Sequence, residues 1–210
     1  MTFTERKIVA LDIGGVCVSL RQELCLKQFG VRPEMPQWPE FWKLDLQLET
    51  GRITEDFFLE SIRNLLGGRM SLDEIRSAWS SFIGPDIPGM ADAVRSLSGR
   101  FRFVYFSNTS RFHLDDVTCM NGFGHLVTGG IYSFSAGAMK PDPAIYEAFE
   151  REYGVPYAYF DDRAENIQGA KSRGWNAYLY HSPEEFRSIL SSAPENEKEA
   201  SRLTSSPGES

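Results

Sequence analysis

Short apolar runs alternate with amphipathic helical segments over the second half of this 210-residue sequence. Runs rich in β-branched and aromatic residues predict strands over residues 101–106, 131–134, 157–160 and 176–180. Between them, capping residues, first-turn prolines and apolar side chains at helical spacing predict helices over 142–153, near 167–170 and from 182 to about 191. Strands that alternate with helices imply parallel pairing with right-handed crossovers. The predicted class is therefore α/β, with a doubly wound parallel sheet of the Rossmann-like kind.

A further strand is predicted near the N-terminus, where an apolar run from Ile8 leads directly to Asp12. This strand would present the Asp12 carboxylate at the carboxyl edge of the sheet, which is where open α/β sheets place their ligands. Gly14 and Gly15 follow and allow the backbone to bend sharply and approach a ligand closely. The pattern suits a small anion or a metal ion held beside Asp12.

Residues 18–88 differ from the rest, because they are predicted to form helices and no strand. Phe58, Ile62, Leu65 and Leu66 recur at helical spacing, and a capping box at 71–74 opens another helix. We therefore expect a small helical cap domain, residues 18–88, inserted into a core formed by residues 1–17 and 89–192. Residues 193–210 are rich in Ser, Pro, Glu and Lys and are predicted to be disordered.

The net charge narrows the range of partners. A formal charge of −7 and a pI near 5.1 argue against general binding to nucleic acid or anionic lipid. The sequence has no apolar run long enough to span a membrane and no targeting segment at its start, so we expect a cytoplasmic protein. Cys17, Cys25 and Cys119 lack metal-site spacing and are expected to be reduced thiols. The oligomeric state is left open.

Polar side chains follow several predicted strands at the point where each strand ends. Asp12, Ser107 and the pair Asp161-Asp162 are expected at one edge of the sheet, and Lys140 lies in a loop that can reach it. Two carboxylates can hold Mg²⁺, which prefers carboxylates, waters and phosphate oxygens. A hydroxyl, backbone amides and a lysine supply donors for phosphate. The set predicts a site for phosphoryl transfer.

The order and spacing of these segments resemble the haloacid dehalogenase superfamily over nearly all of residues 7–190. The similarity is greatest to a bacterial subgroup with a small helical cap, that of the α-glucose 1-phosphate phosphatases. It rests on the segment Gly-Arg-Ile-Thr-Glu-Asp-Phe in the cap, on Ser-Asn-Thr-Ser-Arg-Phe-His after the second strand, and on Phe-Asp-Asp-Arg-Ala-Glu-Asn, at residues 51–57, 107–113 and 160–166.

The resemblance implies roles for the residues that touch the phosphoryl group. Asp12 would be the nucleophile that becomes an aspartyl phosphate, a route by which carboxylates catalyse group transfer. Ser107 and the backbone amide of Asn108 would bind the phosphoryl group. Lys140 would neutralise the nucleophile and the phosphate.

The resemblance also implies a Mg²⁺ site. Its ligands would be Asp12, Asp162 and the backbone carbonyl of Gly14, with Asp161 beside them and Asn166 orienting the acidic loop. Phosphatases of the superfamily usually carry a second Asp at the position of Gly14, as general acid and then base. Glycine keeps the carbonyl but lacks the acid, so we expect this protein either to prefer esters with less basic leaving groups or to use a substitute acid.

His113 is the candidate for that substitute acid or for a substrate contact, although an ordinary histidine in the first turn of a helix is the favoured interpretation. The aromatic segment at 37–42 is expected to fill the core of the cap rather than stack on a sugar.

The leading hypothesis is a Mg²⁺-dependent phosphatase acting on a small phosphorylated metabolite, such as the sugar phosphate glucose 1-phosphate. The first alternative is a catalytically weak or inactive member that binds a phosphorylated ligand or a partner. The second is a haloacid dehalogenase, which needs no metal and is therefore disfavoured by the pair Asp161-Asp162.

Overall fold

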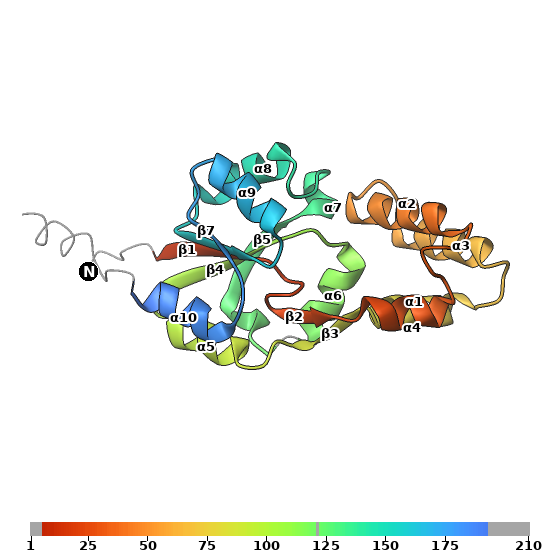
Figure 1. Cartoon of the computed structure of the whole chain (residues 1–210), viewed down its shortest axis with the longest axis horizontal. Helices are drawn as coiled ribbons and strands as arrows, with labels where there is room; N and C mark the ends of the chain where they lie inside the picture. Colours follow the sequence, from red (N-terminus) through yellow and green to blue (C-terminus); the bar gives the residue numbers. More distant parts are fainter. Residues whose placement is uncertain (1–5, 121, 193–210) are drawn as a thin grey trace, which may run out of the picture.

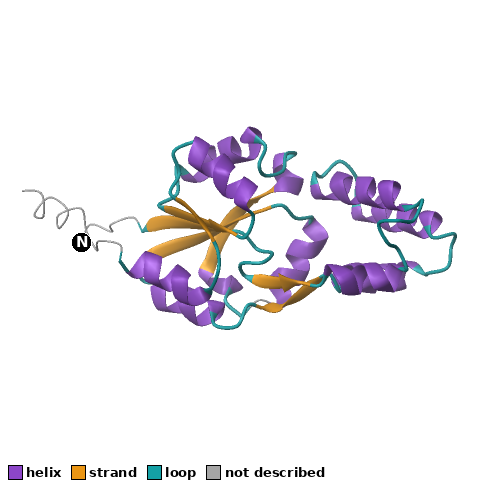
Figure 2. Cartoon of the chain, viewed as in Figure 1, coloured by secondary structure: helices purple, strands orange, loops and turns teal. Residues whose placement is uncertain are grey.

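A computed structural model describes residues 6–120 and 122–192, apart from the side chains of 118–120. Its main sheet, whose strands are orange in Figure 2, has the strand order β5-β4-β1-β6-β7, and every neighbouring pair is parallel. The strands are β1 (Lys7–Leu11), β4 (Phe101–Ser107), β5 (Val127–Tyr132), β6 (Ala158–Asp161) and β7 (Ala177–Leu179). The predicted α/β class with a doubly wound parallel sheet is confirmed.

Helices cover both faces of this sheet (Figure 1). Val9 and Leu11 point to the face covered by α5 (Met90–Leu97) and α10 (Pro183–Ser191), and α6 (Arg111–Met120) adds to that layer. Ala10 points to the opposite face, covered by α8 (Pro143–Tyr153) and α9 (Ala164–Ser172). Successive residues of β1 are thus buried on opposite faces, which explains why its sequence is continuously apolar.

The strand predicted over residues 131–134 is displaced. β5 begins at Val127 and ends at Tyr132, after the short 3₁₀ helix η1 (Gly124–Leu126), and Ser133 opens the helix α7 (Ser133–Ala136). The Ser133 hydroxyl accepts a hydrogen bond from the Thr109 backbone N–H and donates one to the Thr109 carbonyl. These bonds hold α7 against the loop that follows β4.

The cap lies at the end of the molecule away from the N-terminus of β1 (Figure 1). It contains α1 (Gln22–Phe29), α2 (Trp38–Glu49), α3 (Glu55–Leu65) and α4 (Leu72–Ser80). Its helices bury a separate apolar cluster that includes Phe29, Phe41, Phe58, Ile62, Ile75 and Trp79. The predicted capping box forms, because the Ser71 hydroxyl and the Glu74 carboxylate each accept a hydrogen bond from the other's backbone N–H.

The expectation that residues 18–88 contain no strand is wrong. β2 (Val18–Leu20) and β3 (Ile83–Asp86) form an antiparallel two-stranded ribbon that leads into and out of the cap. These strands are too short to show an alternating pattern, and β3 contains Gly84 and Pro85. Both strands lie just inside the predicted cap, residues 18–88, and the exact domain boundaries remain predictions.

The expectations for the cysteines and for membrane-spanning segments can be compared with the described residues. Cys17 and Cys25 are free and buried, whereas the side chain of Cys119 and the tail at 193–210 lie outside the described residues. Within the described part of the chain, no helix combines the length and the apolar character needed to cross a membrane.

Candidate active site

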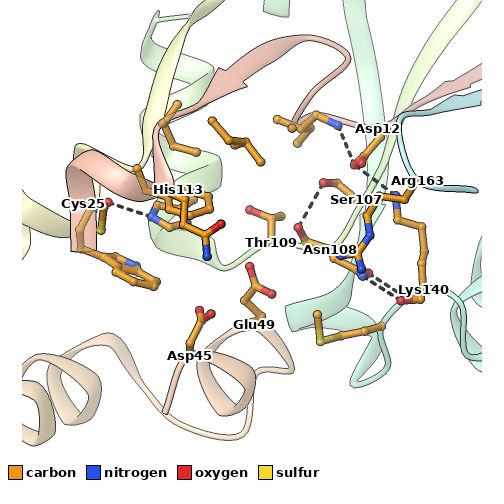
Figure 3. A pocket seen from close by; sticks show the side chains of 18 of the residues that line it. Asp12, Cys25, Asp45, Glu49, Ser107, Asn108, Thr109, His113, Lys140 and Arg163 are labelled. Carbon is orange, nitrogen blue, oxygen red and sulfur yellow. Dashed lines mark hydrogen bonds and ion pairs between the residues drawn. The ribbon is translucent and has the colours of Figure 1, made fainter. Parts of the chain in front are cut away.

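Three strands bring polar groups to the carboxyl edge of the sheet. Asp12 directly follows β1, and its backbone N–H donates to the Phe160 carbonyl at 2.9 Å, which holds it between β4 and β6. Ser107 is the last residue of β4, and Asp161 is the last residue of β6. Figure 3 shows Asp12 and Ser107 from close by, together with Lys140. The edge predicted from the sequence is therefore the place where Asp12, Ser107 and Asp161 meet.

Lys140 reaches the same edge and is fully enclosed there. Its Nζ lies 2.6 Å from Asp161 Oδ2 and 3.1 Å from Asp12 Oδ1, and it donates to the Phe106 carbonyl at 2.7 Å. The Asn108 side chain holds the lysine's loop, because it accepts from the Lys140 backbone N–H and donates to the Lys140 carbonyl. The ammonium group is thus fixed between two carboxylates.

The charges of this cluster are mutually dependent. Burial alone would lower the pKa of Lys140, but Asp12 and Asp161 outweigh it and hold that pKa above its usual value. Burial opposes ionisation of Asp161 as well, yet Lys140 and its hydrogen bonds keep the pKa of Asp161 below its usual value. For Asp12, burial and the Asp161 charge exceed the effect of Lys140 and raise the pKa to about 7.

The carboxylates of Asp12, Asp161 and Asp162 offer oxygen atoms within 4.8 Å of one another. Both Asp161 oxygens already accept hydrogen bonds, from Lys140, Tyr159, Asn166 and the Arg163 backbone N–H. Asp162 is exposed, and burial together with the Asp161 charge raises its pKa. A nearby cation would relieve that repulsion. The carboxylates of Asp12 and Asp162 fit a Mg²⁺ ion, and Asp161 and Asn166 would position the residues around it. Metal binding by Asp12, Asp162 and the Gly14 carbonyl remains a prediction.

The two glycines after Asp12 differ in what a side chain would meet. Gly15 has φ +73°, and a Cβ there would collide with the Asp162 carboxylate. A Cβ on Gly14 would lie 2.9 Å from Leu20 Cδ1, the end of a side chain that is 46% exposed and can move. Gly15 therefore allows the loop to pass beside Asp162, whereas Gly14 is less constrained.

We expect Gly15→Ala to lower both Tm and Mg²⁺ affinity, because it combines backbone strain with displacement of Asp162. Gly14→Ala is the matched control and should change both much less. Differential scanning fluorimetry with and without Mg²⁺ measures the two effects. Equal behaviour of the two variants would contradict this account of the loop.

A pocket of about 440 Å³ lies between this edge and the cap. Its core side is lined by Asp12, Ser107, Asn108 and Lys140, and its cap side by residues that include Trp38, Trp42, Asp45 and Glu49. Figure 3 shows Asp45 and Glu49 pointing from the cap helix α2 into this pocket. Sequence reasoning missed both carboxylates. Their spacing of four residues on an otherwise apolar helix face was the available signal.

Both cap carboxyls have unusual titration behaviour. Burial raises the pKa of Asp45 to about 7. Burial, followed by the charges of Asp45 and Asp12, raises the pKa of Glu49 to about 8, against the opposing effect of Arg163. Both carboxyls are therefore harder to ionise than ordinary surface acids.

His113 lies in the first turn of α6 and lines the pocket, but its ring is buried between other rings. It stacks on Trp79 and Phe82, and its Nε2 lies 3.1 Å from the Trp79 carbonyl. Burial lowers the pKa of His113 to about 4, so the ring is neutral near pH 7. This environment argues against the substitute-acid role and favours the structural one, while a substrate contact remains a prediction.

The aromatic segment at 37–42 has a divided role. Phe41 is buried in the cap cluster, as expected, and Trp38 packs against it while also lining the pocket. Trp42 is 52% exposed and also lines the pocket. The segment therefore offers aromatic surface to a ligand as well as to the core of the cap.

The chain is similar in sequence to a known phosphatase. No protein-family model matches the chain. The chain is 22% identical over 199 residues to D-ribitol-5-phosphate phosphatase of Bacteroides thetaiotaomicron, which covers 88% of this chain and 96% of that relative.

Solved structures show the same fold. A haloacid dehalogenase family enzyme of Bacteroides thetaiotaomicron, in complex with magnesium and inorganic phosphate, has a TM-score of 0.73 at 25% identity over 84% of this chain and 95% of its own. L-2-haloacid dehalogenase from Xanthobacter autotrophicus scores 0.58 at 18% identity over 90% of this chain and 85% of its own. The chain has the fold of the haloacid dehalogenase superfamily hydrolases. The closer similarity to glucose 1-phosphate phosphatases is not confirmed by these relatives.

Proposed function

We propose that this protein is a Mg²⁺-dependent phosphatase that hydrolyses a small phosphorylated metabolite through an aspartyl phosphate on Asp12. The observation that carries the proposal is the position of Lys140, held 3.1 Å from Asp12 and 2.6 Å from Asp161 beside the exposed carboxylate of Asp162. A buried ammonium next to a strand-end carboxylate suits a dianionic substrate, because it offsets repulsion between nucleophile and phosphate.

The side chains suggest how the reaction proceeds. An Asp12 oxygen attacks phosphorus, the bond from phosphorus to the leaving oxygen breaks, and water later cleaves the aspartyl phosphate. Ser107 donates to a phosphoryl oxygen, and Lys140 neutralises charge on both Asp12 and the phosphoryl group. When bound at Asp12 and Asp162, Mg²⁺ supplies further positive charge for the phosphate oxygens.

The finer part of the proposal is a sugar or polyol phosphate substrate. It is supported by the match to an enzyme named D-ribitol-5-phosphate phosphatase and by the resemblance to glucose 1-phosphate phosphatases. It is supported further by a pocket lined with both tryptophan rings and carboxyl groups, since C–H faces of sugars pack on aromatic rings and hydroxyls donate to carboxylates. A screen of phosphorylated metabolites with Mg²⁺ identifies the substrate.

Magnesium is expected to stabilise the protein as well as activate it. At a concentration of 100 times Kd, Mg²⁺ adds about 2.7 kcal/mol to the free energy of unfolding, which raises Tm by several degrees. Asp162→Asn should remove most of this shift, whereas Asp92→Asn, on the exposed surface of α5, should keep it. Thermal melts in MgCl₂ and in KCl of equal ionic strength make the measurement. A shift that survives in Asp162→Asn would remove Asp162 from the metal site.

The catalytically quiet alternative is motivated by Gly14, which lacks the usual acid. Phosphate release from 4-nitrophenyl phosphate with Mg²⁺ supports the enzyme. Tight binding of a phosphate ester without turnover would favour the alternative. Dehalogenation is less well supported, because the acidic pair Asp161-Asp162 suits a metal; halide release from a 2-haloacid in the presence of a chelator would reinstate it.

A further inference from the structure

The missing carboxyl at Gly14 raises the question of which group protonates the leaving oxygen. The pocket brings other titratable side chains near the reaction centre, among them His113, Asp45 and Glu49. His113 is neutral and has its Nε2 occupied by the Trp79 carbonyl. The carboxyls of α2 are therefore the groups in this pocket to consider.

Glu49 has a fixed position relative to the phosphate end of the pocket. It is the last residue of α2, and two residues later Gly51 packs so closely on the Phe134 carbonyl that a Cβ would collide with it. Phe134 belongs to α7, which is hydrogen-bonded through Ser133 to Thr109, in the loop after Ser107. The C-terminal end of α2 therefore packs on α7, the core helix that is hydrogen-bonded to the loop after Ser107.

The orientation of the side chains agrees with this placement. Figure 3 shows the Glu49 carboxyl directed into the space that Ser107, Asn108 and Thr109 border from the core side. The charge of Asp12 acts on Glu49, and so does that of Arg163, the residue after Asp162. Asp45 sits one turn earlier, where its charge acts on the Cys25 thiol of α1. Glu49 is therefore the carboxyl nearer to the reacting groups.

The environment of Glu49 favours a bound proton. Burial opposes its ionisation most, followed by the charges of Asp45 on its own helix and Asp12 at the end of β1, and Arg163 is the charge that favours ionisation. Asp45 Oδ1 is buried and has no hydrogen-bond partner among residues 6–120 and 122–192. A dianionic phosphate ester between the cap and Asp12 adds further negative charge.

We propose that Glu49 is the general acid and base of this enzyme, acting from the cap in place of the carboxyl that Gly14 lacks. The inference rests on the proposed phosphatase function. As the Asp12 oxygen bonds to phosphorus and the ester bond breaks, the electron pair of that bond goes to the leaving oxygen, which takes the proton of Glu49 and departs as an alcohol. Glu49 is then a carboxylate. It accepts a proton from the water that attacks the aspartyl phosphate, which releases phosphate and restores Asp12 and protonated Glu49.

The dependence of rate on leaving group tests this role directly. We expect the native protein with Mg²⁺ to show a shallow dependence of kcat/KM on leaving-group pKa across a series of aryl and alkyl phosphates. In Glu49→Gln, kcat/KM for the most basic leaving groups should fall about 100-fold or more, while 4-nitrophenyl phosphate, whose leaving group needs little protonation, should be affected much less.

Two further variants separate catalysis from structure. Asp45→Asn removes a charge that raises the pKa of Glu49, so it should keep the shallow slope and move the basic limb of the kcat/KM pH profile to lower pH. The double variant Glu49→Gln with Gly14→Asp should regain part of the lost rate for basic leaving groups, because it restores a carboxyl at the family position. Thermal melts show whether each variant is folded.

The outcomes distinguish this inference from the proposed function. If the native protein releases no phosphate from any ester, the phosphatase proposal itself fails. If it is active and Glu49→Gln slows all esters by the same factor, or none of them, Glu49 is not the acid. A slope that steepens in Asp45→Asn but not in Glu49→Gln would overturn the proposal in favour of Asp45.

Discussion

Asp12→Asn is expected to lower the rate of phosphate release by at least about 10,000-fold, the largest effect that any single substitution in this chain should have. Asparagine has nearly the same shape, but its amide cannot form the aspartyl phosphate. The substitution should not lower Tm at pH 8, since burial raises the pKa of Asp12 and its charge is costly in the folded protein. Release of phosphate from an aryl phosphate, followed with Mg²⁺ present, measures the loss.

The matched control is Asp92→Asn. Asp92 is 76% exposed, pairs with Arg95 on the surface of α5 and does not line the pocket. Its removal should leave both rate and Tm unchanged, because exposed ion pairs contribute little. Substantial turnover by Asp12→Asn would show that another group attacks phosphorus.

Lys140→Ala is expected to impair both catalysis and stability. The fall in kcat/KM should reach about 100-fold or more, because the transition state loses a buried positive charge beside the phosphoryl group. Asp161 would remain buried without its ammonium partner, and breaking a buried pair costs about 3–5 kcal/mol, or roughly 10 °C in Tm. The loss of Tm should shrink as the pH falls, since Asp161 then takes up a proton and no longer buries an unpaired charge.

Lys140→Arg should not restore activity. The lysine is enclosed by the Phe106 carbonyl, Asp161 and Asp12, and the wider guanidinium cannot occupy the place of a compact ammonium. Lys171→Ala, on the exposed surface of α9, serves as the control and should behave like the native protein. Near-native turnover in Lys140→Ala would exclude Lys140 from the site.

The sequence was sufficient to predict the core of the fold and the edge where the site lies. Three of the core strands, β1, β4 and β6, lead from an apolar run directly to a polar residue, and parallel strands bring such ends together at one edge. Asp12, Ser107 and Asp161 could therefore be assigned to one edge before their contacts were known. The position of Lys140 in a loop suggested that it can reach the edge of the sheet. Its contacts with Asp12 and Asp161 became known only from the three-dimensional structure.

The parts that sequence reasoning missed depend on long-range geometry. β2 and β3 pair across more than 60 residues, and neither strand is long enough to show a period of two. Asp45 and Glu49 are four residues apart on an otherwise apolar helix face, but this spacing does not say what the face covers. Their raised pKa values depend on the position of the cap over the sheet, which the spacing does not encode.

The β2–β3 ribbon has a consequence for how the sequence of this protein can evolve. Because the chain enters and leaves the cap through two strands that pair with each other, the covalent connections of the cap to the core run through one narrow neck, to which α2 adds a packing contact with α7. Insertions, deletions or replacements in the cap away from the α2–α7 contact should therefore leave the register between β1 and β4 intact. The surface that faces the ligand can therefore diversify while the strand ends that carry Asp12 and Ser107 stay constant.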